Sequence, residues 1–221
     1  MENYPIPAQR LVAQMAQAAQ QAPSRAIAYQ GAPGANSHLA AIGFDPDCIP
    51  LPCFSFEDAI DAVREGKAAR AIIPIENSLH GRVADMHFLL PESGLSIVDE
   101  YFLPIHHCLM AASDAPVTSA ASHVQALGQC RHYLRARGIT PVTYADTAGA
   151  AALIAERQEP GAAAIAPRLA ADTYGLRLIA ENIEDSDDNM TRFVVLAKDA
   201  IAPTGEGPFM TTFMFEVRNV A

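Results

Sequence analysis

Strand-like and helix-like segments alternate along this 221-residue chain, and this alternation constrains the possible fold most strongly. Short apolar runs such as RAIAY and ARAIIPI are typical of buried strands, whereas SFEDAIDAVREG carries apolar residues at helical spacing. Ser55 and Gly66 are expected to cap that helix at its two ends. The pattern predicts an α/β fold with largely parallel sheets.

The N-terminal residues 1–24 are expected to form a helical extension that ends at Pro23. This segment holds too many glutamines for the core of a signal peptide, and no apolar run approaches membrane-spanning length. Half of all residues are apolar, which is typical of a globular protein. We therefore expect a globular, cytoplasmic protein without a membrane partner.

The charge pattern limits the class of ligand. The formal net charge is −10, and no stretch is rich in lysine or arginine. Nucleic acid and anionic membrane surfaces are therefore not expected as partners. A small anion remains compatible with the sequence, because a few arginines and the free N–H groups of helix N-termini are enough to bind it.

The cysteines give no metal-binding signature, since none of the four lies in a C-x-x-C pair. His106 and His107 directly precede Cys108. Adjacent residues on a strand point to opposite faces, however, so these three make poor joint ligands. We expect a packed, reduced thiol at Cys108 and no metal.

Polar clusters follow several predicted strands, and ligands of α/β sheets bind beyond the carboxyl ends of strands. In GAPGANS, Gly34 permits close backbone approach and Ser37 is expected to cap the next helix. An ordinary turn is the alternative interpretation, and the glycine spacing fits neither a dinucleotide-binding motif nor a P-loop. Glu76, Asn77 and Ser78 follow a second strand, where a helix N-terminus capped by Ser or Asn is the alternative.

A third polar cluster opens the predicted strand MTRFVVLA. Alternation on a regular strand places Thr191 and Phe193 on one face and Arg192 on the other. Thr191 and Arg192 can therefore contact one ligand together only at an irregular strand start or at a crossing between lobes.

A fourth segment, HVQALGQCRHYLRARG, is predicted as one helix ended by Gly138. Ser122 or His123 is expected to cap this helix, with Gln125 in its first turn. A surface or capping role is the more common one for a single histidine at a helix start.

Taken in order, these segments resemble the prephenate dehydratase family from Ala26 to about Lys198. The resemblance rests on YQGAPGANSHLAA, AIIPIENSLHGRV, SHVQALGQCRHYL, DTAGAA, AAIAPRLAADTYGL and NMTRFVVLAK. The family's T-R-F signature falls on Thr191, Arg192 and Phe193, and its E-N-S on Glu76, Asn77 and Ser78. The first loop departs from the family's G-T-F-S, so only Gly34 and Ser37 carry over, and S-H-P-Q keeps Gln125 but loses its proline.

The resemblance implies a two-lobe fold of the type II periplasmic-binding-protein kind, with the active site in the cleft between the lobes. Residues 25–104 and 188–200 are expected to form lobe 1, and residues 105–187 lobe 2. The T-R-F signature then lies at a crossing between lobes, where Thr191 and Arg192 are expected to face the cleft together.

Residues 201–221 are expected to be a linker and the first strand of an ACT-type regulatory domain. Their sequence ends in an alternating segment, GPFMTTFMFEVRNVA. Because the chain stops at Ala221, the expectation is an active core with little inhibition by phenylalanine.

The implied activity is the decarboxylating dehydration of prephenate to phenylpyruvate in phenylalanine biosynthesis. No cofactor is expected, because aromatisation drives the reaction. Thr191, the family's essential threonine, is expected to donate to the departing hydroxyl group, with Glu76 as a proton relay if burial raises its pKa. Arg192 is expected to bind the pyruvyl carboxylate or to orient the site. Substrate binding is assigned to Gly34, Ser37, Asn77, Ser78, Gln125 and Phe193.

A homodimer is expected. Two other functions remain open at this point. One is arogenate dehydratase, which acts on the amino analogue of prephenate. The other is a solute-binding module without catalytic activity, since one fold serves many functions.

Overall fold

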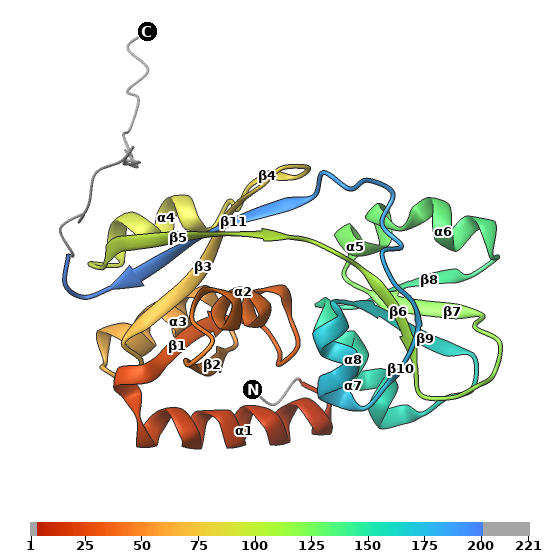
Figure 1. Ribbon diagram of the computed structural model, residues 1–221, viewed down its shortest axis with the longest axis horizontal. Helices are drawn as coiled ribbons and strands as arrows, with labels where there is room; N and C mark the ends of the chain where they lie inside the picture. Colours follow the sequence, from red (N-terminus) through yellow and green to blue (C-terminus); the bar gives the residue numbers. More distant parts are fainter. Residues whose placement is uncertain (1–3, 201–221) are drawn as a thin grey trace, which may run out of the picture.

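The computed structural model describes residues 4–200, which form two α/β lobes, each built on its own sheet (Figure 1). The strands of the first lobe are β1 (Ala26–Gln30), β2 (Ile49–Cys53), β3 (Arg70–Asn77), β4 (Gly81–Arg82), β5 (Ser96–Pro104) and β11 (Met190–Ala197). Its helices are α2 (Asn36–Phe44), α3 (Phe56–Arg64) and α4 (Met86–Glu92). The predicted ACT-type strand lies outside the described residues.

The second lobe holds five strands and four helices of the described chain. The strands are β6 (Cys108–Ala111), β7 (Ser119–Ser122), β8 (Thr140–Thr143), β9 (Ala162–Ala166) and β10 (Arg177–Ala180). The helices are α5 (Val124–Gln129), α6 (Arg131–Ala136), α7 (Thr147–Arg157) and α8 (Arg168–Tyr174).

Both sheets are mixed, so the prediction of largely parallel sheets is wrong. The order is β2-β1-β3-β11-β5 in the first sheet and β10-β6-β9-β7-β8 in the second. Strands β1, β2 and β3 are parallel, as are β7, β8 and β9, but β11 runs antiparallel to β3 and β5, and β6 runs antiparallel to β9 and β10. The antiparallel strands β5, β6, β10 and β11 are those at which the chain crosses between the lobes, once in each direction. The expected two-lobe α/β architecture is confirmed.

The helix predicted for HVQALGQCRHYLRARG is broken into α5 and α6 at Cys130, whose φ of −112° and ψ of 18° are not helical. Asp185, from the segment that returns to the first lobe, causes the break. Its N–H donates to the carbonyl of Gln129 (2.6 Å), and its carboxylate accepts from the N–H of His132 (3.1 Å). These tertiary contacts use backbone groups that a continuous helix would bond internally, so they override the local pattern.

Helix α1 (Ile6–Gln21) packs along both lobes, as the red ribbon at the bottom of Figure 1 shows. It contacts β2 in the first lobe and α7 in the second, and the N–H of Ile6 donates to Glu156 on α7 (3.0 Å). The predicted end of the helix near Pro23 is confirmed, because a short 3₁₀ turn (Pro23–Arg25) follows. Ser55 likewise caps α3 as predicted, in a capping box with Asp58.

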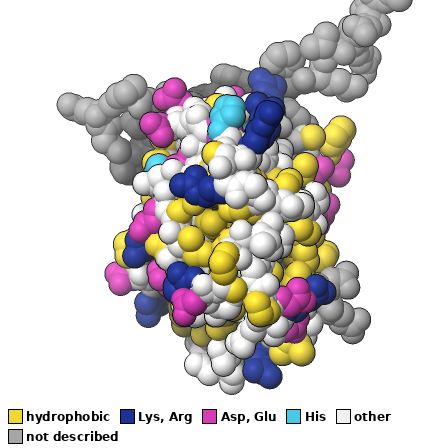
Figure 2. All heavy atoms as spheres, turned by 90° about the vertical axis from the view of Figure 1, so that its right-hand side faces the viewer, with side chains coloured by type: hydrophobic (Ala, Val, Ile, Leu, Met, Phe, Trp, Pro, Cys, Tyr) yellow, Lys and Arg dark blue, Asp and Glu magenta, His cyan; other side chains and the backbone are white. Residues whose placement is uncertain are grey.

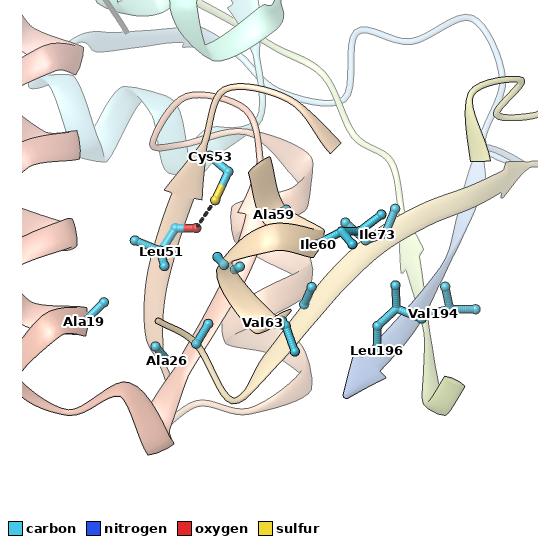
Figure 3. Close-up of a cluster of buried hydrophobic side chains, with 14 of the residues drawn as sticks. Ala19, Ala26, Leu51, Cys53, Ala59, Ile60, Val63, Ile73, Val194 and Leu196 are labelled. Atoms are coloured by element: carbon cyan, nitrogen blue, oxygen red, sulfur yellow. Dashed lines mark hydrogen bonds between the residues drawn. The ribbon is translucent and has the colours of Figure 1, made fainter. Parts of the chain in front are cut away.

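The core of the first lobe fixes the direction of each side chain on β11. Figure 3 shows Val194 and Leu196 facing a buried cluster that includes Ile60 and Ile73. Phe193 and Val195 belong to a different cluster, on the other face of the sheet. Alternation therefore puts Thr191 on the same face as Phe193, and Arg192 on the face of Val194.

The outer face of the second lobe carries charges of both signs (Figure 2). On the outer face of the second lobe, acidic and basic side chains are interspersed with apolar ones (Figure 2). Within residues 4–200, no helix is both long and apolar enough to cross a membrane.

Candidate active site

A cleft of about 620 Å³ is lined by residues of both lobes. Its walls come from the carboxyl ends of β1, β3, β7 and β8 and from the start of β11. This is the location that α/β topology favours for a ligand, and the volume suits a small organic molecule.

Five of the nine site residues predicted from the sequence line the cleft, and four do not. Those in the lining are Ser37, Asn77, Gln125, Thr191 and Phe193. Those outside it are Gly34, Glu76, Ser78 and Arg192.

A bulge in β3 aligns Asn77 with Thr191. Thr191 pairs with Asn77 and Phe193 pairs with Pro74, so the intervening stretch of β3 holds one residue more than that of β11. Without this bulge, Pro74 and Asn77 would point to opposite faces, because they are three residues apart. The bulge brings both to the cleft face, opposite their partners on β11.

Arg192 points away from the cleft. Its Nε donates to Glu100 Oε2 on β5 (2.8 Å), and the two side chains are 19% and 30% exposed. This differs from the expectation that Thr191 and Arg192 face the cleft together. The reason is that β11 is already a regular strand at Thr191, which pairs with β3 on one side and β5 on the other.

Glu76 and Ser78 lie outside the cleft lining for local reasons. Glu76 is exposed and pairs across the ladders with Arg192 and Arg82, so it is not placed to relay a proton from Thr191. No helix follows this cluster; β3 turns back into β4 instead. Ser78 Oγ donates to the carbonyl of Asp188 (2.7 Å) and accepts from the N–H of Met190 (2.9 Å). Ser78 thus fastens the start of β11 to this turn.

Ser37 reaches the cleft, but not as a helix cap. The N-cap of α2 is Ala35, which makes no side-chain capping bond, and Ser37 lies buried in the first turn. In the second lobe, His123 caps α5 as predicted, since its ring accepts from the N–H of Gln125 (3.3 Å).

Asn77 is the centre of the hydrogen-bond network at the base of the cleft. Its Nδ2 donates to Thr191 Oγ1 (2.9 Å) and to Asn189 Oδ1 (2.8 Å). Among residues 4–200, the Thr191 hydroxyl makes no other hydrogen bond. The bond from Asn77 occupies a lone pair of Oγ1, so the hydroxyl hydrogen remains available for a group in the cleft.

A second polar group extends the network into the other lobe. His80 Nδ1 lies 3.2 Å from both Asn77 Oδ1 and Gln129 Nε2, so its tautomer decides which bond forms. Gln129 Oε1 lies 2.5 Å from His107 Nε2. An amide oxygen only accepts, so Nε2 is the ring nitrogen that donates in this bond. Burial lowers the pKa of His107.

The adjacent histidines have separate partners. His106 Nδ1 pairs with Glu184 Oε1 (2.7 Å), whereas the backbone N–H of His107 donates to the other oxygen of the same carboxylate (2.8 Å). The Cys108 side chain is buried, and burial raises the pKa of its thiol. The side chains that the structure describes form no group of three or more His, Cys, Asp or Glu residues suited to a metal.

The cleft residues that sequence reasoning missed include the members of this network: His80, His107, Gln129 and Asn189. Asn189 lies only two positions before Thr191, and Gln129 lies four positions after Gln125, one helical turn further on. Both spacings were available in the sequence. The residues that orient these two amides, however, lie on another strand or in a distant segment of the chain. Spacing within one segment therefore cannot predict them.

The loop between β1 and α2 joins the two lobes beside the cleft. The N–H of Gly34 donates to His38 Nδ1 (3.1 Å), and the His38 ring stacks on Tyr29 with centroids 5.2 Å apart. Tyr174, on α8 of the second lobe, donates its hydroxyl hydrogen to the carbonyl of Pro33 (2.7 Å). Burial lowers the pKa of His38 to about 4 from its usual 6.5.

The low pKa of His38 predicts that stability falls in acid. Between pH 6.5 and about 4, the unfolded chain takes up a proton at His38 that the native protein does not. The free energy of unfolding therefore decreases as the pH drops below 6.5, by at most about 1.4 kcal/mol per pH unit from this group. Urea unfolding between pH 7 and 5 measures the slope. His38→Gln keeps an acceptor for Gly34 and is expected to flatten the slope; an equal slope in both proteins would assign it to other groups.

The sequence matches the family described as prephenate dehydratase over residues 27–201. A bifunctional N-acyl-homoserine lactone acylase/prephenate dehydratase of Komagataeibacter europaeus is 42% identical over 200 residues, which cover 88% of this chain and 71% of that protein. The chloroplastic arogenate dehydratase/prephenate dehydratase 6 of Arabidopsis thaliana is 43% identical over 194 residues, 86% of this chain and 47% of the plant protein. The chain thus spans about half the length of this plant relative.

A solved structure shows the same fold. The prephenate dehydratase of Arthrobacter aurescens, in complex with L-Phe, matches with a TM-score of 0.75 at 28% identity, over 82% of this chain and 63% of that one.

Proposed function

Since the chain belongs to the prephenate dehydratase family, we propose that it converts prephenate to phenylpyruvate in phenylalanine biosynthesis. The observation that carries the proposal is the position of Thr191. The threonine of the family's T-R-F signature lies in the inter-lobe cleft, with its hydroxyl oriented by Asn77 and its hydrogen available.

The reaction requires the protein to orient the substrate and to stabilise one leaving group, the ring hydroxyl. The bond from the ring to its carboxylate breaks, and that electron pair enters the ring. The bond from the ring to the hydroxyl oxygen breaks, and the oxygen leaves with its electron pair. One added proton turns that oxygen into water, so that the prephenate dianion gives carbon dioxide, water and the phenylpyruvate anion. Gain of aromaticity drives the reaction.

Thr191 donates a hydrogen bond to the departing oxygen. Negative charge grows on this oxygen as its bond breaks, and a donor fixed in position stabilises the transition state more than the ground state. A threonine hydroxyl is too weak an acid to give up its proton at neutral pH, so solvent supplies the proton. Glu76 takes no part in this step, because it is exposed outside the cleft.

The other end of the substrate carries the pyruvyl carboxylate. The first turn of α2, at Asn36 and Ser37, presents backbone N–H groups to the cleft, and Arg82 adds a positive charge to the lining. These groups suit an anion. Gln125 lines the same cleft and contacts the substrate's body, whereas Phe193, which is 1% exposed, supports this wall from the core.

Arg192 orients the site through Glu100 instead of binding a carboxylate. Arg192→Gln and Glu100→Gln are then expected to lower kcat/KM by similar factors, below about 10-fold, because the ion pair is still partly open to solvent and lies outside the cleft lining. The double variant should cost no more than either single variant. Steady-state kinetics of the three proteins measures this. A rise in KM of about 30-fold or more for Arg192→Gln alone would instead indicate direct contact with the substrate.

The deciding experiment is incubation of the pure protein with prephenate, with phenylpyruvate measured by ultraviolet absorbance. Arogenate should be tested beside it, because the plant relatives carry that name and the described cleft contains a carboxylate, Asp146, that suits an amino group. Higher kcat/KM for arogenate would reassign the substrate within the family. Turnover of neither substrate would leave a solute-binding module as the function.

The remaining parts of the proposal concern assembly and organisation. The protein is a cytoplasmic homodimer, with residues 25–104 and 188–200 as lobe 1 and residues 105–187 as lobe 2. Light scattering of the purified protein tests the dimer, and limited proteolysis tests the lobe boundaries.

A further inference from the structure

Asn77 has only one possible amide orientation. Its Oδ1 accepts from the backbone N–H groups of both Leu79 and His80, each at 3.0 Å. A backbone N–H is always a donor, so the atom facing these groups must be the oxygen. The Nδ2 of Asn77 therefore faces Thr191 and Asn189 as a donor.

The orientation of Asn189 follows from that of Asn77. The atom of Asn189 that lies 2.8 Å from Asn77 Nδ2 must be an acceptor, which makes it Oδ1. The other end of the amide is then Nδ2, a donor. Asn189 is 3% exposed, and its Nδ2 has no hydrogen-bond partner among residues 4–200. A buried donor left unbonded costs about 1–3 kcal/mol, so it is expected to have a partner when the protein works.

Asn189 lines the same cleft as Thr191, and both residues bond to the same Asn77 amide. The backbone of Asn189 is held as well, because its carbonyl accepts from the N–H of Ile105 (2.8 Å) where the chain crosses between lobes. The Asn77 amide thus holds Asn189 through its Oδ1 and Thr191 through its hydroxyl oxygen, which leaves the Nδ2–H groups of Asn189 and the hydroxyl hydrogen of Thr191 as unbonded donors among the described residues.

We propose that Asn189 Nδ2 is a second catalytic hydrogen-bond donor to the departing hydroxyl oxygen, acting together with Thr191. This inference rests on the proposed function. The oxygen that leaves with the electron pair of its broken ring bond receives one hydrogen bond from each residue, and the proton that completes water comes from solvent. Two fixed donors aimed at one oxygen stabilise the charge that develops on it, as in other sites where an oxygen becomes anionic.

The effects on kcat and KM distinguish a donor to the leaving oxygen from a residue that only binds substrate. A donor to the leaving oxygen acts mainly in the transition state, so its loss lowers kcat and leaves KM nearly unchanged. A donor to either carboxylate would act in the ground state as well, and its loss would raise KM. The product phenylpyruvate lacks the leaving oxygen, so its affinity should not depend on Asn189.

The test compares Asn189→Ala and Asn189→Asp with the wild type. Asn189→Asp has nearly the same shape and keeps an acceptor for Asn77. When its carboxyl group is protonated it donates a hydrogen bond in place of Nδ2, and when it is ionised it repels the leaving oxygen. Asn182→Asp is the matched control, because Asn182 is exposed and lies outside the cleft lining. Circular dichroism and thermal unfolding establish that each variant is folded.

We expect kcat of Asn189→Ala to fall about 10²-fold, with KM for prephenate and the inhibition constant of phenylpyruvate within about threefold of wild type. Activity of Asn189→Asp relative to wild type should rise as the pH falls, since burial raises the pKa of the introduced carboxyl group. Asn182→Asp should show wild-type kcat and the wild-type pH profile.

Three results with the variants would overturn the inference while leaving the proposed function intact. Wild-type kcat in Asn189→Ala would show that no donor is needed there, and raised KM at unchanged kcat would make Asn189 a substrate-binding residue. Parallel pH profiles for wild type and Asn189→Asp would remove the donor role. The wild type is assayed first with prephenate and with arogenate; absence of turnover on both would overturn the proposed function itself, and this inference with it.

Discussion

Thr191→Ala is expected to lower kcat by about 10³-fold or more, with KM changed by less than about threefold. Removal of the hydroxyl takes away the donor to the leaving oxygen and also the acceptor that helps to fix Asn77. The first loss acts in the transition state, and the second loosens a neighbouring amide that also holds Asn189. The combined effect should therefore exceed that of removing Asn189 alone. Steady-state kinetics with prephenate measures it.

Two further substitutions separate the hydroxyl from the shape of the side chain. Thr191→Ser keeps the donor and should retain activity within about tenfold of wild type, whereas Thr191→Val keeps the shape and should be as inactive as Thr191→Ala. Because Thr191 is only half-buried, all three variants should unfold close to the wild-type temperature. Near-wild-type turnover by a folded Thr191→Val protein would remove the hydroxyl from the mechanism.

Much of the fold could be read from local sequence patterns. The alternation of strand and helix periods predicts the α/β class, whereas the two lobes are implied by the family resemblance. Ser55 supplies a capping signal that the structure reproduces. The rule that ligands bind at the carboxyl ends of strands places the cleft correctly beside Asn77 and Ser37. These features depend on residues close together in the chain, so spacing is enough to find them.

The features that spacing missed depend on contacts between distant segments. The break at Cys130 is set by Asp185, more than fifty residues away. The bulge in β3 decides that Asn77, and not Glu76, faces the cleft, and it exists only in the pairing with β11. Arg192 likewise points away from the cleft because of a neighbouring strand, since its partner Glu100 lies on β5. The alternation of residues along one strand does not predict bulges or side-chain partners that depend on the neighbouring strands.

Gly34 shows how a residue assigned to substrate binding has a different role in the structure. It lies outside the cleft lining, with φ of +93°, and a Cβ added there would sit 2.8 Å from Ala170 Cα on α8. The contact is with backbone, so no side-chain rotation can relieve it. Gly34 therefore permits the close approach of the first-lobe loop to the second lobe.

Gly34→Ala is accordingly expected to lower the free energy of unfolding by about 2–4 kcal/mol, from positive-φ strain together with overpacking. Gly66→Ala is the matched control: its φ is +76°, and nothing lies within 4 Å of an added Cβ. It should cost only the strain, about 1–2 kcal/mol. The difference between the two variants in the free energy of unfolding, measured in urea, gives the cost of the steric clash. Equal decreases in both variants would show that the loop moves away from α8 at no energetic cost.

The same substitution should also affect catalysis, because the clash lies between the lobes. The least costly relief is to move the loop away from α8, which shifts Asn36 and Ser37 in the cleft wall and weakens the hold on the substrate's carboxylate. KM for prephenate should therefore rise in Gly34→Ala, whereas Thr191, on a separate strand, keeps its contacts and kcat changes less. Gly66→Ala should leave both constants unchanged, since α3 ends away from the cleft. A large fall in kcat at constant KM would instead mean that the glycine loop contacts the reacting end of the substrate.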